Sequence, residues 1–200
     1  RLKEKISNVS CINVKARDLA DFTAVSMNED NSVIYLMMRF KKIRDKYKIK
    51  ISFDGKKEVP AFKNILSSGK LDMFFSSNGK LAWAVYDGKR IGSDEFLQSF
   101  ITYGGKKYEF ESVCAEALSV AGTGEGVRIK GEIHLPGETQ CGSFVYDFFT
   151  ALGSDAVFVR TTVYYPYTPE LVSISTENSS LGRYTDMKWQ EAVPFQITPQ

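Results

Sequence analysis

Four dipeptides that favour tight turns divide the middle of the chain and constrain what it can fold into. They fall within about fifty residues, at Asp54-Gly55, Asn78-Gly79, Asp87-Gly88 and Gly104-Gly105. Asn, Asp and Gly tolerate the positive φ angles that two-residue hairpin turns require. Each pair lies between apolar or alternating segments. Because turns this dense are hard to reconcile with helices, the sequence predicts antiparallel hairpins.

The segments beside these turns alternate with the period of a strand. Tyr47, Ile49, Ile51 and Phe53 share one face of residues 47–53, and lysines and a serine share the other. This pattern predicts a half-buried strand. Further strands are predicted at residues 71–75 and 81–86, paired across the Asn-Gly turn, and at residues 127–135.

The second half of the chain supports the same fold class. Residues 143–150 and 156–165 are rich in β-branched and aromatic side chains, with a short loop between them. Residues 115–121 contain helix formers but continue an alternating stretch, so we predict a strand there. Only residues 94–100 suit a single helical turn. The chain is therefore predicted to be all-β, a large antiparallel β-sandwich with few or no helices.

The chain has 200 residues, 43% of them hydrophobic, which is enough apolar material for a core. A shift in composition at residues 60–70 divides residues 1–64, N-terminal strands or a small β-domain, from residues 65–200, the main β-sandwich domain. Residues 189–197 suit a closing strand. The first five residues contain neither Met nor an apolar signal core. We therefore expect a piece of a larger protein, and its compartment, extracellular or cytoplasmic, stays open.

The charge balance argues against nucleic acid as a partner. Lys and Arg number 26 against 24 Asp and Glu, a formal net charge of +2. The basic run between Arg39 and Lys50 suits a solvated strand face that also discourages edge-to-edge pairing. Membrane insertion is not expected either, because no apolar run approaches the roughly 18 residues that span a bilayer.

The three cysteines, Cys11, Cys114 and Cys141, are far apart and odd in number. At most one disulfide could form, and reduced, buried thiols are the expected state. No CxxC pair is present, so a cysteine-based zinc site is not expected, and no loop has the ligand spacing of a calcium site. The sequence predicts no metal site and no cofactor.

Glu132 and His134 are the one candidate acid/base pair. On an alternating strand they share a face, opposite Ile133 and Leu135. A carboxylate beside an imidazole can transfer protons, but the same pattern suits a solvated surface pair at the end of a strand. The chain has a single His and no GxSxG motif, so a Ser-His triad is not expected.

Aromatic side chains are the candidates for stacking on sugar rings. Trp83, Tyr165, Tyr167 and Trp189 form the candidate carbohydrate-binding set. Trp83 lies in an apolar run, so packing in the core is its default expectation. Tyr165 and Tyr167 flank Pro166 where a strand ends, a better place for an exposed contact.

Several strand patterns together resemble a known family. Residues 71–88 (LDMFFSSNGKLAWAVYDG) resemble the opening of the large β-sandwich in α-mannosidase-type glycoside hydrolases, with a strand, an Asn-Gly turn and a second strand ending near an Asp. Residues 127–133 and 142–163 are similar to the middle of that domain, and residues 189–199 to a segment near its end. The resemblance covers residues 65–199 and implies a galactose-mutarotase-like supersandwich.

The resemblance implies a supporting role. In such multidomain enzymes the sandwich packs beside a separate catalytic barrel, which holds the nucleophile and the metal ligands. The expected function is therefore a non-catalytic domain of a larger carbohydrate-active protein, with carbohydrate or a neighbouring catalytic domain of the same chain as its partner. Two alternatives stay open: an extracellular adhesion or protein-interaction sandwich, and a mutarotase-like sugar epimerase using Glu132 and His134.

Overall fold

The fold is that of a computed structural model. The structure describes residues 8–26, 31, 33–55, 60–76, 78, 81–91, 98–103, 106–137, 139, 141–164 and 172–177. Three of the predicted carbohydrate-binding residues, Tyr165, Tyr167 and Trp189, lie outside this part of the chain, as does the strand predicted at residues 189–197.

The described residues form strands and one short 3₁₀ helix, η1 (Val9–Cys11). The strands are β1 (Asn13–Ala16), β2 (Leu19–Ser26), β3 (Ile34–Phe40), β4 (Ile49–Ser52), β5 (Ile65–Ser68), β6 (Leu71–Phe75), β7 (Leu81–Tyr86), β8 (Lys89–Ile91), β9 (Gln98–Tyr103), β10 (Lys106–Glu109), β11 (Glu111–Ala117), β12 (Val120–Gly122), β13 (Gly126–Ile133), β14 (Gly142–Thr150), β15 (Val157–Tyr164) and β16 (Val172–Glu177). The all-β prediction is confirmed. Residues 115–117 and 120–121 lie in strands, as predicted, and residues 98–100 begin a strand instead of completing a helical turn.

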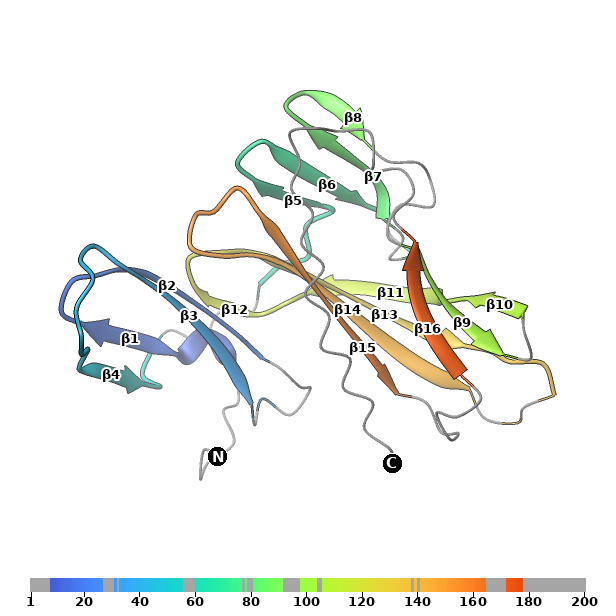
Figure 1. The fold of residues 1–200 in the computed structure, drawn as a ribbon, viewed down its shortest axis with the longest axis horizontal. Coiled ribbons are helices and arrows are strands. Elements are labelled where there is room, and N and C mark those ends of the chain that lie inside the picture. The colour runs from blue at the N-terminus through green and yellow to red at the C-terminus, as the bar shows by residue number, and fades with distance from the viewer. Residues whose placement is uncertain are drawn as a thin grey trace.

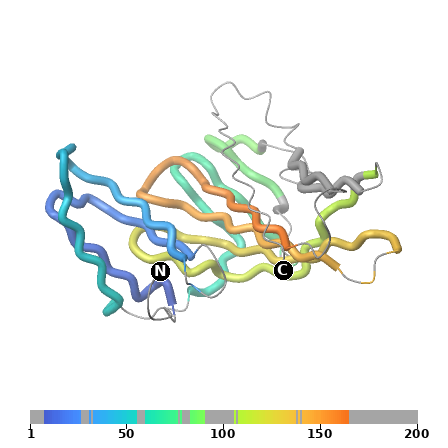
Figure 2. The backbone as a smooth tube through the Cα atoms, turned by 60° about the horizontal axis from the view of Figure 1, so that its bottom comes forward, coloured from blue at the N-terminus to red at the C-terminus, as the bar shows by residue number. Residues whose placement is uncertain are grey.

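The strands pair antiparallel in five sheets (Figure 1). The central sheet has the order β11-β13-β14-β15, and the sheet β5-β6-β7-β8 packs against it. The sheet β10-β9-β16 lies near one end of the central sheet, and β12-β2-β3 and β1-β4 lie at the other. Figure 2 shows the same separation of the N-terminal strands from another direction. The molecule is an antiparallel β-sandwich with a smaller N-terminal layered unit.

Strand β12 pairs with the N-terminal unit, although it lies between two strands of the central sheet in the sequence. After β11 the chain leaves the central sheet, and Val120 to Gly122 pair with β2 at Val25, Ala24 and Thr23. The chain then turns back into β13, and this turn is held from both sides. Thr123 donates its N–H to the Phe22 carbonyl at 2.9 Å, and Thr150 donates its N–H to the Glu125 carbonyl at 3.0 Å. Residues 120–122 thus extend the sheet that holds β2 and β3.

Three of the four predicted turns join paired strands, namely β6 to β7, β7 to β8 and β9 to β10. At the second of these, Asp87 and Gly88 have φ angles of 50° and 76°, as a type I′ hairpin requires. The prediction for Asp54-Gly55 is wrong, because β4 pairs with β1 and not with the next strand. Gly55 instead donates its N–H to the Cys11 carbonyl at 2.9 Å, and a Cβ at this position would lie 3.0 Å from that oxygen. Here glycine allows a close approach of two backbones.

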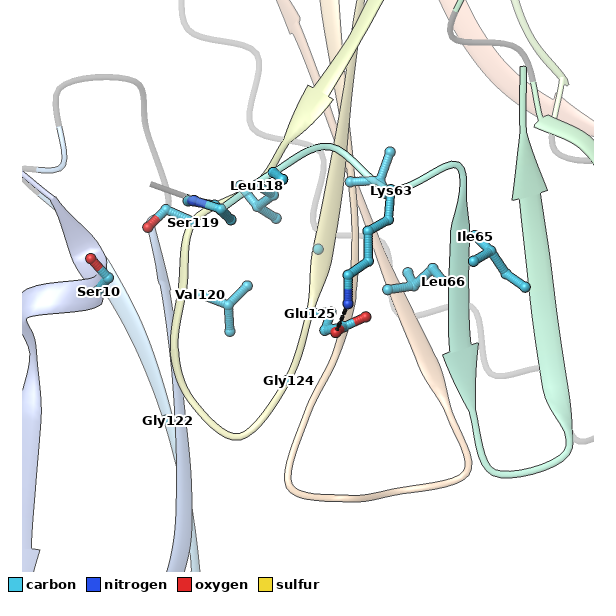
Figure 3. Close-up of a pocket in the computed structure, with 14 residues that line it drawn as sticks. Ser10, Lys63, Ile65, Leu66, Leu118, Ser119, Val120, Gly122, Gly124 and Glu125 are labelled. Atoms are coloured by element: carbon cyan, nitrogen blue, oxygen red, sulfur yellow. Dashed lines mark hydrogen bonds and ion pairs between the residues drawn. The ribbon is translucent and has the colours of Figure 1, made fainter. Parts of the chain in front are cut away.

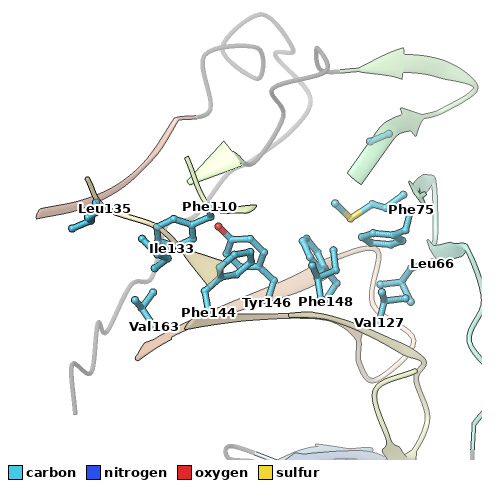
Figure 4. Packing of buried hydrophobic residues seen from close by; sticks show 13 residues of the cluster. Leu66, Phe75, Phe110, Val127, Ile133, Leu135, Phe144, Tyr146, Phe148 and Val163 are labelled. Carbon is cyan, nitrogen blue, oxygen red and sulfur yellow. The ribbon is translucent and has the colours of Figure 1, made fainter. Parts of the chain in front are cut away.

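The main core lies between the central sheet and the β5–β8 sheet (Figure 4). Phe144, Tyr146 and Phe148 project from one face of β14 into this core. Phe148 lies beside Phe75 of the facing sheet, and Phe144 and Tyr146 lie beside Phe110. The ring centroids of Phe75 and Phe148 are 5.1 Å apart in an edge-to-face arrangement, a geometry that favours aromatic pairs beyond their buried area.

The strand predicted at residues 47–53 is present as β4, but it is not half-buried. Ile51 lies opposite Val14 of β1 in the antiparallel register, so the two side chains share a face. Val14 is 5% exposed, whereas Ile49, Ile51 and Phe53 are 39%, 48% and 46% exposed. Alternation determines which side chains share a face, but it does not determine how far the covering layer extends across that face. Here the layer covers Val14 of β1 and leaves Ile51 of β4 exposed.

The other face of β14 carries a buried charge. Asp147 lies opposite Arg128 of β13 and Arg160 of β15, so the three side chains form one row across the sheet. Arg128 donates Nε to Oδ1 of Asp147 at 2.6 Å and Nη2 to Oδ2 at 3.1 Å, and Arg160 donates Nη2 to Oδ2. The side chains are 1% exposed for Asp147, 13% for Arg128 and 17% for Arg160. Removing the carboxylate would leave two poorly solvated guanidinium groups facing each other.

We therefore expect Asp147→Asn to lower the free energy of unfolding by about 3 kcal/mol, because it breaks a buried ion pair from one side. Urea denaturation followed by circular dichroism measures the change. Glu125→Gln is the control, since its partner Lys63 and Glu125 itself are both exposed, and we expect a loss below about 1 kcal/mol. Equal losses in the two variants would contradict the importance of the Asp147 row.

Candidate functional site

Trp83 lies on the outer face of the β5–β8 sheet. Its neighbour Ala84 points into the core and is fully buried, so alternation directs Trp83 to the opposite side. Trp83 is 40% exposed, and the expectation that it packs in the core is wrong. The sequence does not predict this exposure, because apolar and aromatic side chains occupy both faces of the β6–β7 hairpin and alternation alone does not show which face is buried.

The Trp83 ring has two neighbours on that face. Phe74 lies directly opposite it on β6, and the two rings stack with centroids 4.9 Å apart and planes inclined by 21°. The Arg90 guanidinium carbon lies 5.8 Å from the Trp83 ring centroid, within reach of a cation–π interaction. Asp72 pairs with Val85, which pairs with Arg90, so a carboxylate and a cation share the outer face with the two rings. We call Asp72, Phe74, Trp83 and Arg90 the Trp83 face.

The predicted pair of Glu132 and His134 lies where β13 ends. His134 Nε2 and Glu132 Oε2 are 2.9 Å apart, and the side chains are 48% exposed for Glu132 and 54% for His134. Ile133 and Leu135 are 0% and 6% exposed. The predicted division of faces is therefore confirmed, with the polar pair outside and the apolar pair in the core.

The structure brings a third residue to this pair. The carboxylate of Glu132, the imidazole of His134 and the thiol of Cys141 all lie within 4.8 Å of one another. Cys141 was not among the predicted site residues, because the spacing of the cysteines along the chain does not show which strand lies beside them. The signal was the turn at Pro136-Gly137, since folding the chain back there places residue 141 beside residue 134.

A groove lies where the N-terminal unit meets the sandwich (Figure 3). Its volume is about 320 Å³, and its wall includes Ser10, Leu66, Leu118 and Val120. The groove does not include Glu132, His134 or Trp83. Lys63 and Glu125, the charged side chains in its wall, form an ion pair with each other.

The β12–β13 connection, residues 123–125, contributes to the wall of this groove and leads into a strand, whereas a P-loop leads into a helix. Gly122 and Gly124 have φ angles of 77° and 145°. A Cβ at Gly122 would lie 2.1 Å from the Phe22 carbonyl oxygen, and one at Gly124 would lie 2.3 Å from that of Thr150. Glycine is required there for packing.

Comparisons with known proteins found no match. No family model matches the chain, and neither does any curated protein or any solved structure. Among the residues that the structure describes, no helix has the length and hydropathy needed to cross a membrane.

The different exposure of the three cysteines allows the position of Cys141 to be tested by alkylation. Cys141 is exposed, whereas Cys11 and Cys114 are partly buried. In folded protein treated with a chelator, we expect iodoacetamide to modify Cys141 first, because it is the most exposed of the three cysteines. Peptide mass mapping over time gives the three rates. Faster modification of Cys11 or Cys114 would contradict the placement of the hairpin.

Proposed function

We propose that this chain is a non-catalytic β-sandwich domain of a larger carbohydrate-active protein, and that it binds carbohydrate through the Trp83 face. The observation that carries the proposal is the exposed, stacked ring of Trp83 on the outer side of a sheet whose inner side forms the core. The β6–β7 hairpin that bears this ring is also the segment whose sequence resembles the opening of the glycoside hydrolase sandwich.

The chemistry of the Trp83 face suits a pyranose ring. One side of such a ring presents C–H groups, which gain dispersion and lose contact with water when they stack on a flat aromatic surface. Phe74 stacks on the indole and holds its orientation, so little side-chain entropy is lost when the sugar binds. Asp72 and Arg90 supply an acceptor and donors for hydroxyl groups at the margin of the rings.

The surroundings of Glu132 and His134 favour a non-catalytic role over the epimerase alternative. Both side chains lie on an open surface, where water would compete for every proton and hydrogen bond offered to a substrate. An acid/base pair acts best when a closed site positions the substrate and excludes water. A supporting domain beside a separate catalytic domain accounts for this arrangement.

Binding to a panel of oligosaccharides, measured by calorimetry, tests the proposal. We expect Trp83→Ala to weaken binding by at least about tenfold, because each 1.4 kcal/mol of lost contact is one factor of ten. Phe158→Ala is the matched control, since Phe158 is 39% exposed and lies on a different sheet. Binding should be unchanged in that variant.

Two results would contradict the proposal. One is the absence of saturable binding to any oligosaccharide of the panel. The other is equal weakening by Trp83→Ala and Phe158→Ala, which would indicate non-specific adsorption to exposed rings.

The adhesion or protein-interaction alternative is favoured by one observation, the exposed apolar row formed by Ile49 and Ile51 of β4 and by Phe53, which follows this strand. Rows of this kind mark contact surfaces more often than isolated apolar side chains do. Sedimentation velocity of the wild type and of Ile51→Lys tests self-contact through this row. Association that the substitution removes would support the alternative, and a monomer at all concentrations would exclude self-contact.

A further inference from the structure

The end of the β13–β14 hairpin gathers three kinds of metal ligand on one face. In the antiparallel register Glu132 pairs with Ser143, and Ile133 pairs with Gly142. Continuing this register by one step places His134 opposite Cys141, on the same side as Glu132 because side chains two apart share a face. Ile133 and Leu135 occupy the core side. The pleat of the hairpin therefore holds the carboxylate, the imidazole and the thiol together.

The distances suit a shared ion. The three ligand atoms lie within 4.8 Å of one another. Ligand bonds of about 2.0 to 2.3 Å in a tetrahedral zinc site place the ligand atoms roughly 3.5 Å apart. Because all three side chains are exposed, rotation about their own bonds can supply the remaining adjustment without moving the backbone.

The charge around the cluster also favours a cation. Glu111 of β11 lies directly opposite Glu132 of β13, so two carboxylates share the outer face. Like charges directly opposite each other destabilise a sheet. Lys130 is the next outward residue on β13, and its ammonium group is paired with Glu116 at 2.9 Å. A divalent ion at Glu132 would offset the repulsion between the two carboxylates.

We propose that Glu132, His134 and Cys141 bind one Zn²⁺ ion, with water in the fourth position. A thiolate and an imidazole favour zinc over Ca²⁺ and Mg²⁺, which prefer oxygen ligands. The ion would join the end of β13 to the beginning of β14, because Glu132 and His134 come from one side of the hairpin and Cys141 from the other. This site is separate from the Trp83 face, so the inference does not depend on the proposed carbohydrate binding.

Calorimetric titration of the metal-free protein with zinc chloride tests the site. We expect saturable binding of one ion per chain, weakened at least about tenfold by Cys141→Ser, His134→Gln or Glu132→Gln. Cys114→Ser is the matched control, because this thiol lies on β11 outside the cluster. It should bind zinc like the wild type. Thermal unfolding without zinc shows that each variant is folded, as the exposure of the substituted side chains predicts.

Two further readouts identify the ligands directly. Cobalt in place of zinc should give a thiolate-to-metal charge-transfer band that Cys141→Ser abolishes and Cys114→Ser retains. Zinc should also slow the alkylation of Cys141 while leaving the rate at Cys114 unchanged.

Three results would overturn the inference. The first is the absence of saturable binding at micromolar zinc. The second is zinc affinity that is unchanged in Cys141→Ser. The third is a zinc-dependent dimer in sedimentation with half an ion per chain, which would mean that two copies share the ion. Loss of zinc binding with intact oligosaccharide binding, or the reverse, distinguishes failure of this inference from failure of the proposed function.

Discussion

Strand β14 is buried on both of its faces, and the arrangement of the neighbouring sheets depends on this. Phe144, Tyr146 and Phe148 pack toward the β5–β8 sheet, while Asp147 and Phe149 point the other way and are also buried. A carboxylate in that position costs several kcal/mol unless it is paired. Arg128 on β13 and Arg160 on β15 both pair with Asp147. The ion pairs of this row therefore favour β13 and β15 as the neighbours of β14.

Both candidate sites are consequences of what the core requires. Burial of Ala84 turns Trp83 outward, and burial of Ile133 turns Glu132 and His134 outward. The β5–β8 sheet thus presents a stacked aromatic surface and the central sheet presents a group of candidate metal ligands, while the faces that the two sheets turn toward each other remain apolar. Such outer faces can acquire binding functions with little effect on stability, because substitutions there do not disturb packing.

The sequence was sufficient to predict features that depend only on neighbouring residues of the chain. Alternation predicted the strands, and the Asn-Gly and Asp-Gly turns predicted the hairpins of β6, β7 and β8. Alternation also predicted that Glu132 and His134 lie side by side, because residues two apart on a strand point to the same face. The turn prediction failed at Gly55, where the same dipeptide permits a close approach to the Cys11 carbonyl. Cys141 was missed because its place depends on the register of two strands.

The sequence by itself therefore determined the all-β class, most of the hairpins and the sets of side chains that share a face. Only the tertiary structure decided which of those faces are covered. Ile51 and Trp83 lie in apolar patterns and are nevertheless exposed, whereas Asp147 is charged and buried. The reason is that the pleat of a strand is set by its own backbone, while burial is set by whichever distant segment packs against it.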